Sequence, residues 1–224
     1  MTGRALTEIQ LVVFDLDGTL VDSKLDLALS VNAMREEMGL GPLPLDLVAS
    51  YVGHGVTALI QRALGELASE ANVQNGMAFF LQYYHQHMLD NTRPYPGVQE
   101  ALEELRSRAL TVLTNKPVNF SREMLEKLGM ASYFSAIYGG NSFPRKKPDP
   151  MGLRTMMDDL KVSPQQTLIV GDSDTDILTG RNAGVWTCGV TYGFGAHTLE
   201  KAPPDLLLAN LLELPPLLNG QAAL

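Results

Sequence analysis

The sequence of 224 residues has a single cysteine, no long apolar run and no excess of positive charge. One cysteine, Cys188, rules out an internal disulfide and favours a reducing compartment, so we expect a cytoplasmic protein. The apolar runs are too short for a signal peptide or a membrane span. A net charge of −8 disfavours nonspecific binding to nucleic acid or to an anionic membrane, so we expect neither as a partner.

What the sequence does contain is a series of short apolar runs separated by segments of helix length. Fully apolar runs that alternate with helices predict parallel strands covered on both faces, which is a doubly wound α/β sheet. We expect the last short helix to stop at Pro215-Pro216. The expected strands are Leu11–Phe14, Leu110–Leu113, Ala136–Tyr138, Thr167–Val170, Val185–Val190 and Leu206–Leu208, with helices at Ser121–Leu128, Pro150–Leu160 and Asp174–Asn182.

Residues 23–95 interrupt this alternation. They contain no convincing strand, but Lys24–Met38 and Met77–Leu89 carry apolar residues at helical spacing. Pro94, Pro96 and Gly97 then indicate a hinge. We therefore expect a sheet domain made of residues 1–22 and 96–224, with a helical domain at 23–95 inserted between them.

Polar residues follow three of the predicted strands. Ligands of an open parallel sheet bind beyond the carboxyl ends of its strands, so these residues are expected to meet at one edge. In a continuing strand, Asp15 and Asp17 would share a face at about 6–7 Å. The set is Asp15, Asp17, Gly18 and Thr19 after the first strand, Thr114, Asn115 and Lys116 after the second, and Asp172, Ser173 and Asp176 after Gly171, joined by Lys147 before a helix.

This combination of side chains suits phosphoryl transfer. A carboxylate can attack phosphorus and form an aspartyl phosphate, while Lys147 with Thr114 and Asn115 can supply the positive charge and donors that phosphate oxygens need. Several carboxylates in one pocket require a cation, and oxygen-only ligands favour Mg²⁺. No Cys/His set offers a zinc site, since His85 and His87 would point apart on a helix and are expected at the surface.

The segments Asp15-Leu16-Asp17-Gly18-Thr19, Thr114-Asn115, Lys147 and Gly171–Asp176 resemble the four ordered motifs of the haloacid dehalogenase-like phosphatases. The resemblance implies that Asp15 is the nucleophile and Asp17 the general acid and base, that Thr114 binds the phosphoryl group, and that Lys147 offsets negative charge. It also implies Mg²⁺ held by Asp15, Asp172 and the backbone carbonyl of Asp17. Gly18, Thr19, Ser173 and Asp176 would support the site.

The helical insertion resembles the cap of phosphoglycolate phosphatases, through Tyr51–Val56, Tyr95–Val98 and Gly139-Gly140. The resemblance implies a small phosphorylated substrate, with phosphoglycolate as the first choice, under a cap that excludes water. A substrate with a carboxylate needs donors, and we expect His54 and Arg62 to provide them. Alternatively, Arg62 pairs with Glu66 one helical turn away, and His54 only helps a loop to turn.

Other assignments stay open at this point. The connection before the strand at Leu110 is shortened to Ala109, and Asn141 stands where this family often has aspartate. Rival activities are a nucleotidase, a pyrophosphatase, a sugar phosphatase and a β-phosphoglucomutase-like mutase. A phosphonate hydrolase is disfavoured because residues 25–95 contain no lysine, and a non-enzymatic binding module because all four motifs are intact. The sequence leaves open whether the protein is a monomer or a homodimer.

Overall fold

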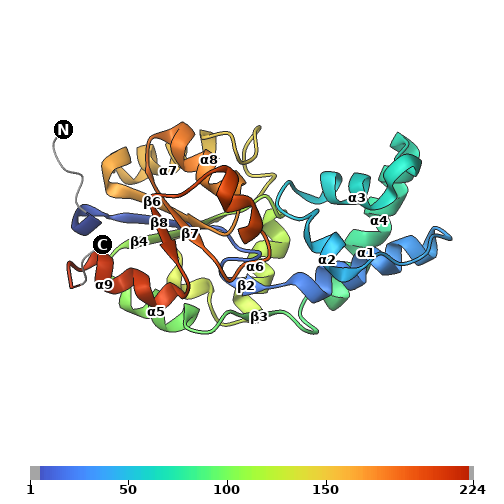
Figure 1. Cartoon of the computed structure of the whole chain (residues 1–224), viewed down its shortest axis with the longest axis horizontal. Coiled ribbons are helices and arrows are strands. Elements are labelled where there is room, and N and C mark those ends of the chain that lie inside the picture. Colours follow the sequence, from blue (N-terminus) through green and yellow to red (C-terminus); the bar gives the residue numbers. More distant parts are fainter. Residues whose placement is uncertain (1–5, 222–224) are drawn as a thin grey trace.

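A six-stranded sheet forms the centre of the molecule in the computed structural model, which describes residues 6–221 (Figure 1). All neighbouring strands are parallel, in the order β5-β4-β1-β6-β7-β8, so the first strand of the chain lies inside the sheet. This is the doubly wound α/β architecture that the apolar runs predict. The strands are β1 (Leu11–Phe14), β4 (Ala109–Leu113), β5 (Ala136–Tyr138), β6 (Thr167–Gly171), β7 (Trp186–Val190) and β8 (Leu206–Leu208).

Helices cover both faces of the sheet because alternate residues of β1 are buried on opposite sides. Val12 and Phe14 belong to the apolar core that includes side chains of α5 (Val98–Glu104), α6 (Val118–Lys127) and α9 (Leu214–Leu218). Leu11 and Val13 pack with α7 (Met151–Leu160), and α8 (Asp174–Ala183) lies beside α7 against β6 and β7. Figure 1 shows α7 and α8 on one side of the sheet and α5 and α9 on the other.

A helical lobe, residues 24–87, lies beyond the carboxyl end of β1 (Figure 1). Its helix α4 begins at Glu70, not at Met77 as predicted, because Gly76 interrupts the apolar pattern without ending the helix. A Cβ at Gly76 would lie 2.8 Å from the sulfur of Met34, so the missing side chain lets α1 and α4 pack closely. The lobe consists of α1 (Lys24–Glu37), α2 (Leu45–Ala49), α3 (Val56–Leu64) and α4 (Glu70–His87).

Two chain crossings connect the lobe to the sheet. They pair as short antiparallel strands, β2 (Val21–Asp22) and β3 (Arg93–Pro94). We expected no strand within 23–95, and β3 escaped notice because it is only two residues long and contains a proline. Buried Asp26 ties the crossings together, since it accepts hydrogen bonds from the backbone and side chains of Asn91 and Thr92. The domain limits at 22/23 and 95/96 stay a prediction.

Two local expectations need correction or completion. Pro215 and Pro216 lie in the first turn of α9 and begin the helix instead of ending it, because a first-turn proline loses no helical hydrogen bond. The short connection before β4 is a tight turn. There the guanidinium of Arg108 donates to the carbonyl oxygens of Ile9 and Leu218 at 3.1 and 2.7 Å. Within residues 6–221, every helix is too short or too polar to cross a bilayer.

Candidate active site

Three of the predicted site residues lie together at the carboxyl edge of the sheet. Asp15 follows β1, Thr114 follows β4 and Asp172 follows β6. Because β1 pairs with β4 on one side and with β6 on the other, these three side chains come from adjacent strand ends. All three are buried. The sheet therefore brings the predicted motifs together as the sequence indicated.

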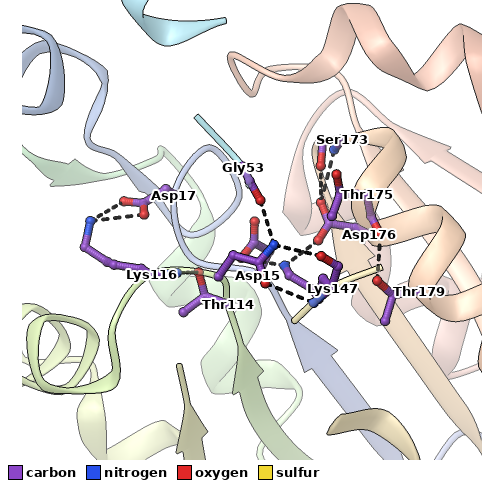
Figure 2. Close-up of polar contacts among 11 residues, drawn as sticks. Asp15, Asp17, Gly53, Thr114, Lys116, Lys147, Ser173, Thr175, Asp176 and Thr179 are labelled. Carbon is purple, nitrogen blue, oxygen red and sulfur yellow. Dashed lines mark hydrogen bonds and ion pairs between the residues drawn. The ribbon is translucent and has the colours of Figure 1, made fainter. Parts of the chain in front are cut away.

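Lys147 lies between two carboxylates of this edge (Figure 2). Its Nζ is 2.8 Å from Asp15 Oδ1 and 2.5 Å from Asp176 Oδ1, and its side chain is 2% exposed. Burial alone would lower the pKa of the Lys147 ammonium, but the two carboxylates more than offset this and raise it, so the lysine is a cation. Burial raises the pKa of Asp15 to about 6, against the opposing effect of Lys147.

A cluster of three carboxylates could hold a metal ion. Oxygens of Asp15, Asp172 and Asp176 all lie within 4.8 Å of one another. Burial, and then the charges of Asp176 and Asp15, raise the pKa of Asp172 well above its usual range. Asp15 Oδ1 is paired with Lys147 by charge, and within residues 6–221 it has no aligned hydrogen-bond donor. Crowded carboxylates of this kind gain most from a divalent cation.

Asp176 is held in place from both sides. Lys147 donates to its Oδ1, and the backbone N–H and hydroxyl of Ser173 donate to its Oδ2 at 3.2 and 2.7 Å, as a capping box at the start of α8 (Figure 2). Both carboxylate oxygens are therefore occupied by protein donors. The arrangement suits the supporting role that the sequence predicts for Asp176 and Ser173.

Gly18 makes room for Asp172. A Cβ on Gly18 would lie 2.2 Å from Asp172 Oδ2, and the residue has a positive φ of 86°. Asp172 Oδ2 accepts a hydrogen bond from the backbone of Gly195 at 2.7 Å. Thr19 is fully buried, and its carbonyl oxygen accepts from the hydroxyl of Tyr192 at 2.8 Å. Gly18 and Thr19 thus shape the turn after β1 and carry no group that reaches the cavity described below.

Asn115 joins the sheet edge to the helical lobe. Its side-chain amide donates to the carbonyl oxygens of Gly53 at 2.8 Å and Lys147 at 3.1 Å, while its Oδ1 accepts from the backbone N–H of Lys147 at 3.0 Å. The Thr114 hydroxyl accepts from the backbone N–H of Lys116 at 3.2 Å. Asn115 therefore fixes the backbone of Lys147 and also contacts the lobe.

Asp17 has a partner, Lys116, that the sequence analysis expected at the sheet edge but to which it gave no role. The Nζ of Lys116 lies 2.9 and 3.0 Å from the two oxygens of Asp17 and 2.7 Å from the hydroxyl of Tyr84. The Ser23 hydroxyl also donates to Asp17 at 2.5 Å. Burial lowers the pKa of Lys116, but its pairing with Asp17 and Tyr84 raises it overall, so the ammonium is charged. The sequence signal that could have assigned Lys116 to the site is its position directly after Thr114-Asn115.

A cavity of about 70 Å³ lies between the sheet edge and the helical lobe. The sheet domain contributes Asp15, Asp17, Thr114, Asn115, Lys116 and Asp172, whereas the lobe contributes mainly apolar groups such as Val52, Val56, Leu59, Phe80 and Leu81.

His54 and Arg62 are absent from this lining, which differs from the expectation that they face the substrate. Both are exposed, and the guanidinium of Arg62 donates to the backbone oxygen of Tyr51 at 3.2 Å. The reason is the rotation of α3. This helix buries Leu59, Ile60 and Ala63 and leaves Arg62 on its outer side. Nor does the structure show an ion pair between Arg62 and Glu66, the alternative raised from the sequence, among the described residues.

The two histidines of α4 lie at the surface, as expected. His85 contacts Glu123 at 2.9 Å and His87 contacts Asp90 at 2.8 Å, and both rings are exposed. Asn141 lies outside the cavity, where its side-chain oxygen accepts from the backbone N–H of Val118 at 2.9 Å. This residue therefore anchors the start of α6 and is not part of the site edge.

Comparison with known proteins places the fold and site in context. Residues 12–190 match the family model described as haloacid dehalogenase-like hydrolase. The chain is 40% identical over 220 residues to a phosphoglycolate phosphatase of Neisseria meningitidis, with 94% of each chain covered. It is 41% identical over 216 residues to a phosphoglycolate phosphatase of Chromobacterium violaceum, with 93% of this chain and 96% of the relative covered.

Solved structures agree with this assignment. The crystal structure of a predicted phosphoglycolate phosphatase from Haemophilus somnus superposes with a TM-score of 0.88 at 33% identity, covering 92% of this chain and 96% of that one. The matched region in the family model includes all four motifs, from Asp15 to Asp176. By motif order, fold and similarity along most of its length, the chain belongs to the haloacid dehalogenase-like hydrolases.

Proposed function

We propose that this hydrolase is a phosphatase that cleaves a small phosphorylated acid, with phosphoglycolate as the leading substrate, through an aspartyl-phosphate intermediate. The observation that carries the proposal is the buried carboxylate of Asp15, which lies 2.8 Å from the Lys147 ammonium and lines the cavity below the lobe. Relatives that cover most of the chain are named phosphoglycolate phosphatases, which supports the choice of substrate.

The chemistry uses two carboxylates in different roles. A carboxylate oxygen of Asp15 attacks phosphorus and forms the acyl phosphate, while the ester oxygen leaves and takes a proton from Asp17. Asp17 then accepts a proton from the water that attacks phosphorus, so that phosphate leaves and Asp15 is restored. The position of both residues in the cavity lining supports this division of labour.

Three other side chains prepare the site for an anion. Lys147 keeps a fixed positive charge beside Asp15, where negative charge accumulates in the transition state. Thr114 presents a hydroxyl in the cavity lining, and Asn115 fixes the backbone of Lys147 through paired hydrogen bonds. These groups are in place before substrate arrives, so little reorganisation is needed during the reaction.

The site residues fit a divalent cation, and we propose Mg²⁺ as the cofactor. Asp15 and Asp172 would hold it, since Asp172 is crowded by carboxylates and Asp15 Oδ1 has no aligned donor among residues 6–221. Asp176 would support them, because its oxygens already accept from Lys147 and Ser173. When bound, the ion would neutralise the carboxylates and the phosphoryl oxygens. Oxygen-only ligands favour Mg²⁺ over zinc.

The size of the cavity favours a small substrate over the rival activities. A volume of about 70 Å³ is roughly that of five probe-sized water positions. A two-carbon phosphorylated acid needs less space than a nucleotide or a hexose phosphate, so the cavity in this arrangement of lobe and sheet favours the smaller substrate. The lobe would act as a cap that excludes water during the covalent step.

We further propose that the protein works in the reducing cytoplasm with the small acid as its partner. Cys188 is buried with a free thiol, which supports a reducing location, and burial raises its pKa so that it is unreactive.

The test is phosphate release from a substrate panel. Purified protein would be given phosphoglycolate, sugar phosphates, nucleotides and pyrophosphate, each with and without Mg²⁺, and the Asp15→Asn protein would serve as the control. We expect Mg²⁺-dependent release that is fastest with phosphoglycolate and absent in the variant. Absence of release from all substrates would overturn the proposed function, and a faster reaction with another class would overturn the substrate alone.

A further inference from the structure

Lys116 is the single cation among the described residues that line the cavity. Its side chain is 5% exposed, and its ammonium bridges two groups: the carboxylate of Asp17 on the sheet side and the hydroxyl of Tyr84 on the lobe side. Figure 2 shows the Lys116–Asp17 pair apart from the cluster of Asp15, Lys147 and Asp176. The sheet side of the cavity therefore has two separate positive charges, Lys116 and Lys147. Only Lys116 reaches the lining of the cavity.

Three further cations near the cavity, Lys146, Lys147 and Arg62, do not contribute to its lining. Lys146 is exposed, and its Nζ would lie 2.9 Å from a Cβ on Gly55. Lys147 is paired with Asp15 and Asp176 and does not contribute to the lining. Arg62 lies outside the cavity, and the lobe wall is mainly apolar. An acidic group of a bound substrate, placed away from the phosphoryl end, thus finds Lys116 as the one cation in the described lining of the cavity. An unpaired anion buried against the apolar wall would be strongly disfavoured.

From this placement we propose that Lys116 binds the carboxylate of the substrate and so selects an acidic phosphate ester over a neutral one. The inference rests on the proposed function and assigns the part of the site that recognises the group away from phosphorus.

The contacts of Lys116 also suggest how binding and chemistry are connected. An ammonium has three donors, and here two face the oxygens of Asp17 and one faces Tyr84. The substrate carboxylate takes over a donor from Asp17, which leaves Asp17 to turn toward the ester oxygen. A neutral ester cannot make this exchange. The selection therefore acts both on binding and on the availability of Asp17.

Tyr84 is the positioning residue in this arrangement. Its ring stacks on Phe80 at 5.4 Å between centroids and lies against Phe120 at 5.8 Å, and the Lys116 ammonium is 4.6 Å from its centroid. The ring thus fixes the hydroxyl that holds Lys116. Because Tyr84 belongs to α4, the lobe determines where the carboxylate-binding cation lies.

The first test measures binding with two matched ligands that cannot be hydrolysed: phosphonopropionate, which has a carboxylate, and propylphosphonate, which does not. Calorimetry with the wild-type protein and Mg²⁺ should show tighter binding of phosphonopropionate by about 10- to 100-fold, the usual range for a hydrogen bond to a charged group. The preference should disappear in Lys116→Met. An unchanged preference in Lys116→Met would overturn the proposal.

A matched pair of variants guards against misfolding. Lys116→Met leaves Asp17 without its cation, so the same ligands would also be compared between Asp17→Asn and the Asp17→Asn/Lys116→Met double variant, which differ in Lys116 alone. The preference should be present in the first protein and lost in the second. Lys127→Met, an exposed lysine of α6, should keep it. Equal preferences in the two Asp17→Asn proteins would contradict the assignment.

Kinetics separates recognition from a purely structural role. Lys116→Met should lower kcat/KM for phosphoglycolate by about 10- to 100-fold more than it lowers kcat/KM for ethyl phosphate, since both esters lose the cation beside Asp17 but only phosphoglycolate loses a carboxylate contact. Tyr84→Phe should show the same selectivity with a smaller loss. Equal losses for both esters would mean that Lys116 acts only by holding Asp17, which would refute the proposal. If wild-type protein releases no phosphate, the proposed function fails, and the binding preference alone decides on Lys116.

Discussion

The two walls of the cavity, one from the sheet and one from the lobe, consist of different kinds of side chain. The sheet wall supplies carboxylates, a hydroxyl, an amide and a lysine from strand ends, whereas the lobe wall is mainly aliphatic and aromatic. The strand ends are fixed relative to one another by backbone hydrogen bonds of the sheet. The lobe is connected through two short crossings at β2 and β3. The groups whose chemistry needs fixed distances are therefore at the strand ends of the sheet. The lobe determines the shape of the cavity and the access of water to it.

This contrast predicts different outcomes for substitutions on the two walls. Loss of the sheet-wall carboxylates should reduce the rate for every substrate, because Asp15 and Asp17 act on phosphorus or on the leaving group, whereas Lys116 is proposed to select the substrate. Changes on the lobe side should act on the choice of substrate or have little effect. The predictions below test this difference, starting from the sheet wall.

Asp15→Asn should have the largest effect. Loss of the nucleophile should reduce kcat by at least about 10⁴-fold, while the folded structure is retained. Phosphate release under saturating substrate measures the change, and circular dichroism checks the fold. Asp158→Asn, an exposed aspartate of α7, is the matched control and should have wild-type activity. Substantial turnover by Asp15→Asn would rule out the covalent mechanism.

Asp17→Asn should reduce kcat for phosphoglycolate by about 10²- to 10⁴-fold, the usual contribution of general acid–base catalysis. The loss in the first step should be much smaller for nitrophenyl phosphate, whose leaving group needs no proton. Since breakdown of the intermediate also needs Asp17, phosphoenzyme should accumulate, and rapid-quench experiments would detect it. If Asp17→Asn lost the same activity with phosphoglycolate and with nitrophenyl phosphate, and no phosphoenzyme accumulated, Asp17 would have another role.

Mg²⁺ should stabilise the folded protein through the sheet wall. At 100 times its dissociation constant, a ligand that binds only the folded state adds about 2.7 kcal/mol to the free energy of unfolding. Thermal unfolding with and without Mg²⁺ should show this gain in the wild-type protein. The gain should be reduced in Asp172→Asn and kept in Asp158→Asn. An equal gain in all three proteins would place the ion elsewhere.

Without metal, stability should depend on pH through Asp15. Burial raises the pKa of this carboxyl from 3.8 to about 6 in the folded state, so the protonated form favours folding. Its contribution is complete below about pH 4 and is lost as the pH rises through about 6, on the order of 3 kcal/mol. Urea unfolding in chelator across this range should show a steeper fall for the wild type than for Asp15→Asn. Parallel curves would contradict the raised pKa.

His54→Ala and Arg62→Ala should have the smallest effect. Both side chains are exposed outside the cavity, so kcat/KM for phosphoglycolate should change by no more than about twofold, as is usual for surface substitutions. Steady-state kinetics measures this. A large rise in KM would instead support the sequence-based expectation that these two residues bind the substrate, and would mean that the lobe closes further in the working enzyme.

The residues that sequence analysis could find are those that follow strands. Asp15, Thr114 and Asp172 each come directly after an apolar run, and a parallel sheet places the ends of its neighbouring strands together. The strand bounds of β1, β5 and β8 also agree with the prediction, because each strand is a short apolar run, although only β1 is fully buried.

The remaining features of the site depend on tertiary packing, which cannot be predicted from the sequence pattern. Tyr84 resembles any core aromatic of an amphipathic helix, and its contact with Lys116 depends on how α4 lies over the loop after β4. The outward direction of Arg62 depends on the rotation of α3. Gly76 looks like a break in a helix until the sulfur of Met34 is found against it.

The most direct test of the account is to identify the phosphorylated residue. Wild-type protein would be mixed with radiolabelled phosphoglycolate and Mg²⁺ and quenched in acid, and the labelled peptide would be identified by mass spectrometry after treatment with and without hydroxylamine. We predict label on Asp15 that hydroxylamine removes, as expected for an acyl phosphate, and no label in Asp15→Asn. Turnover without a labelled carboxylate, or with label on another residue, would contradict the account.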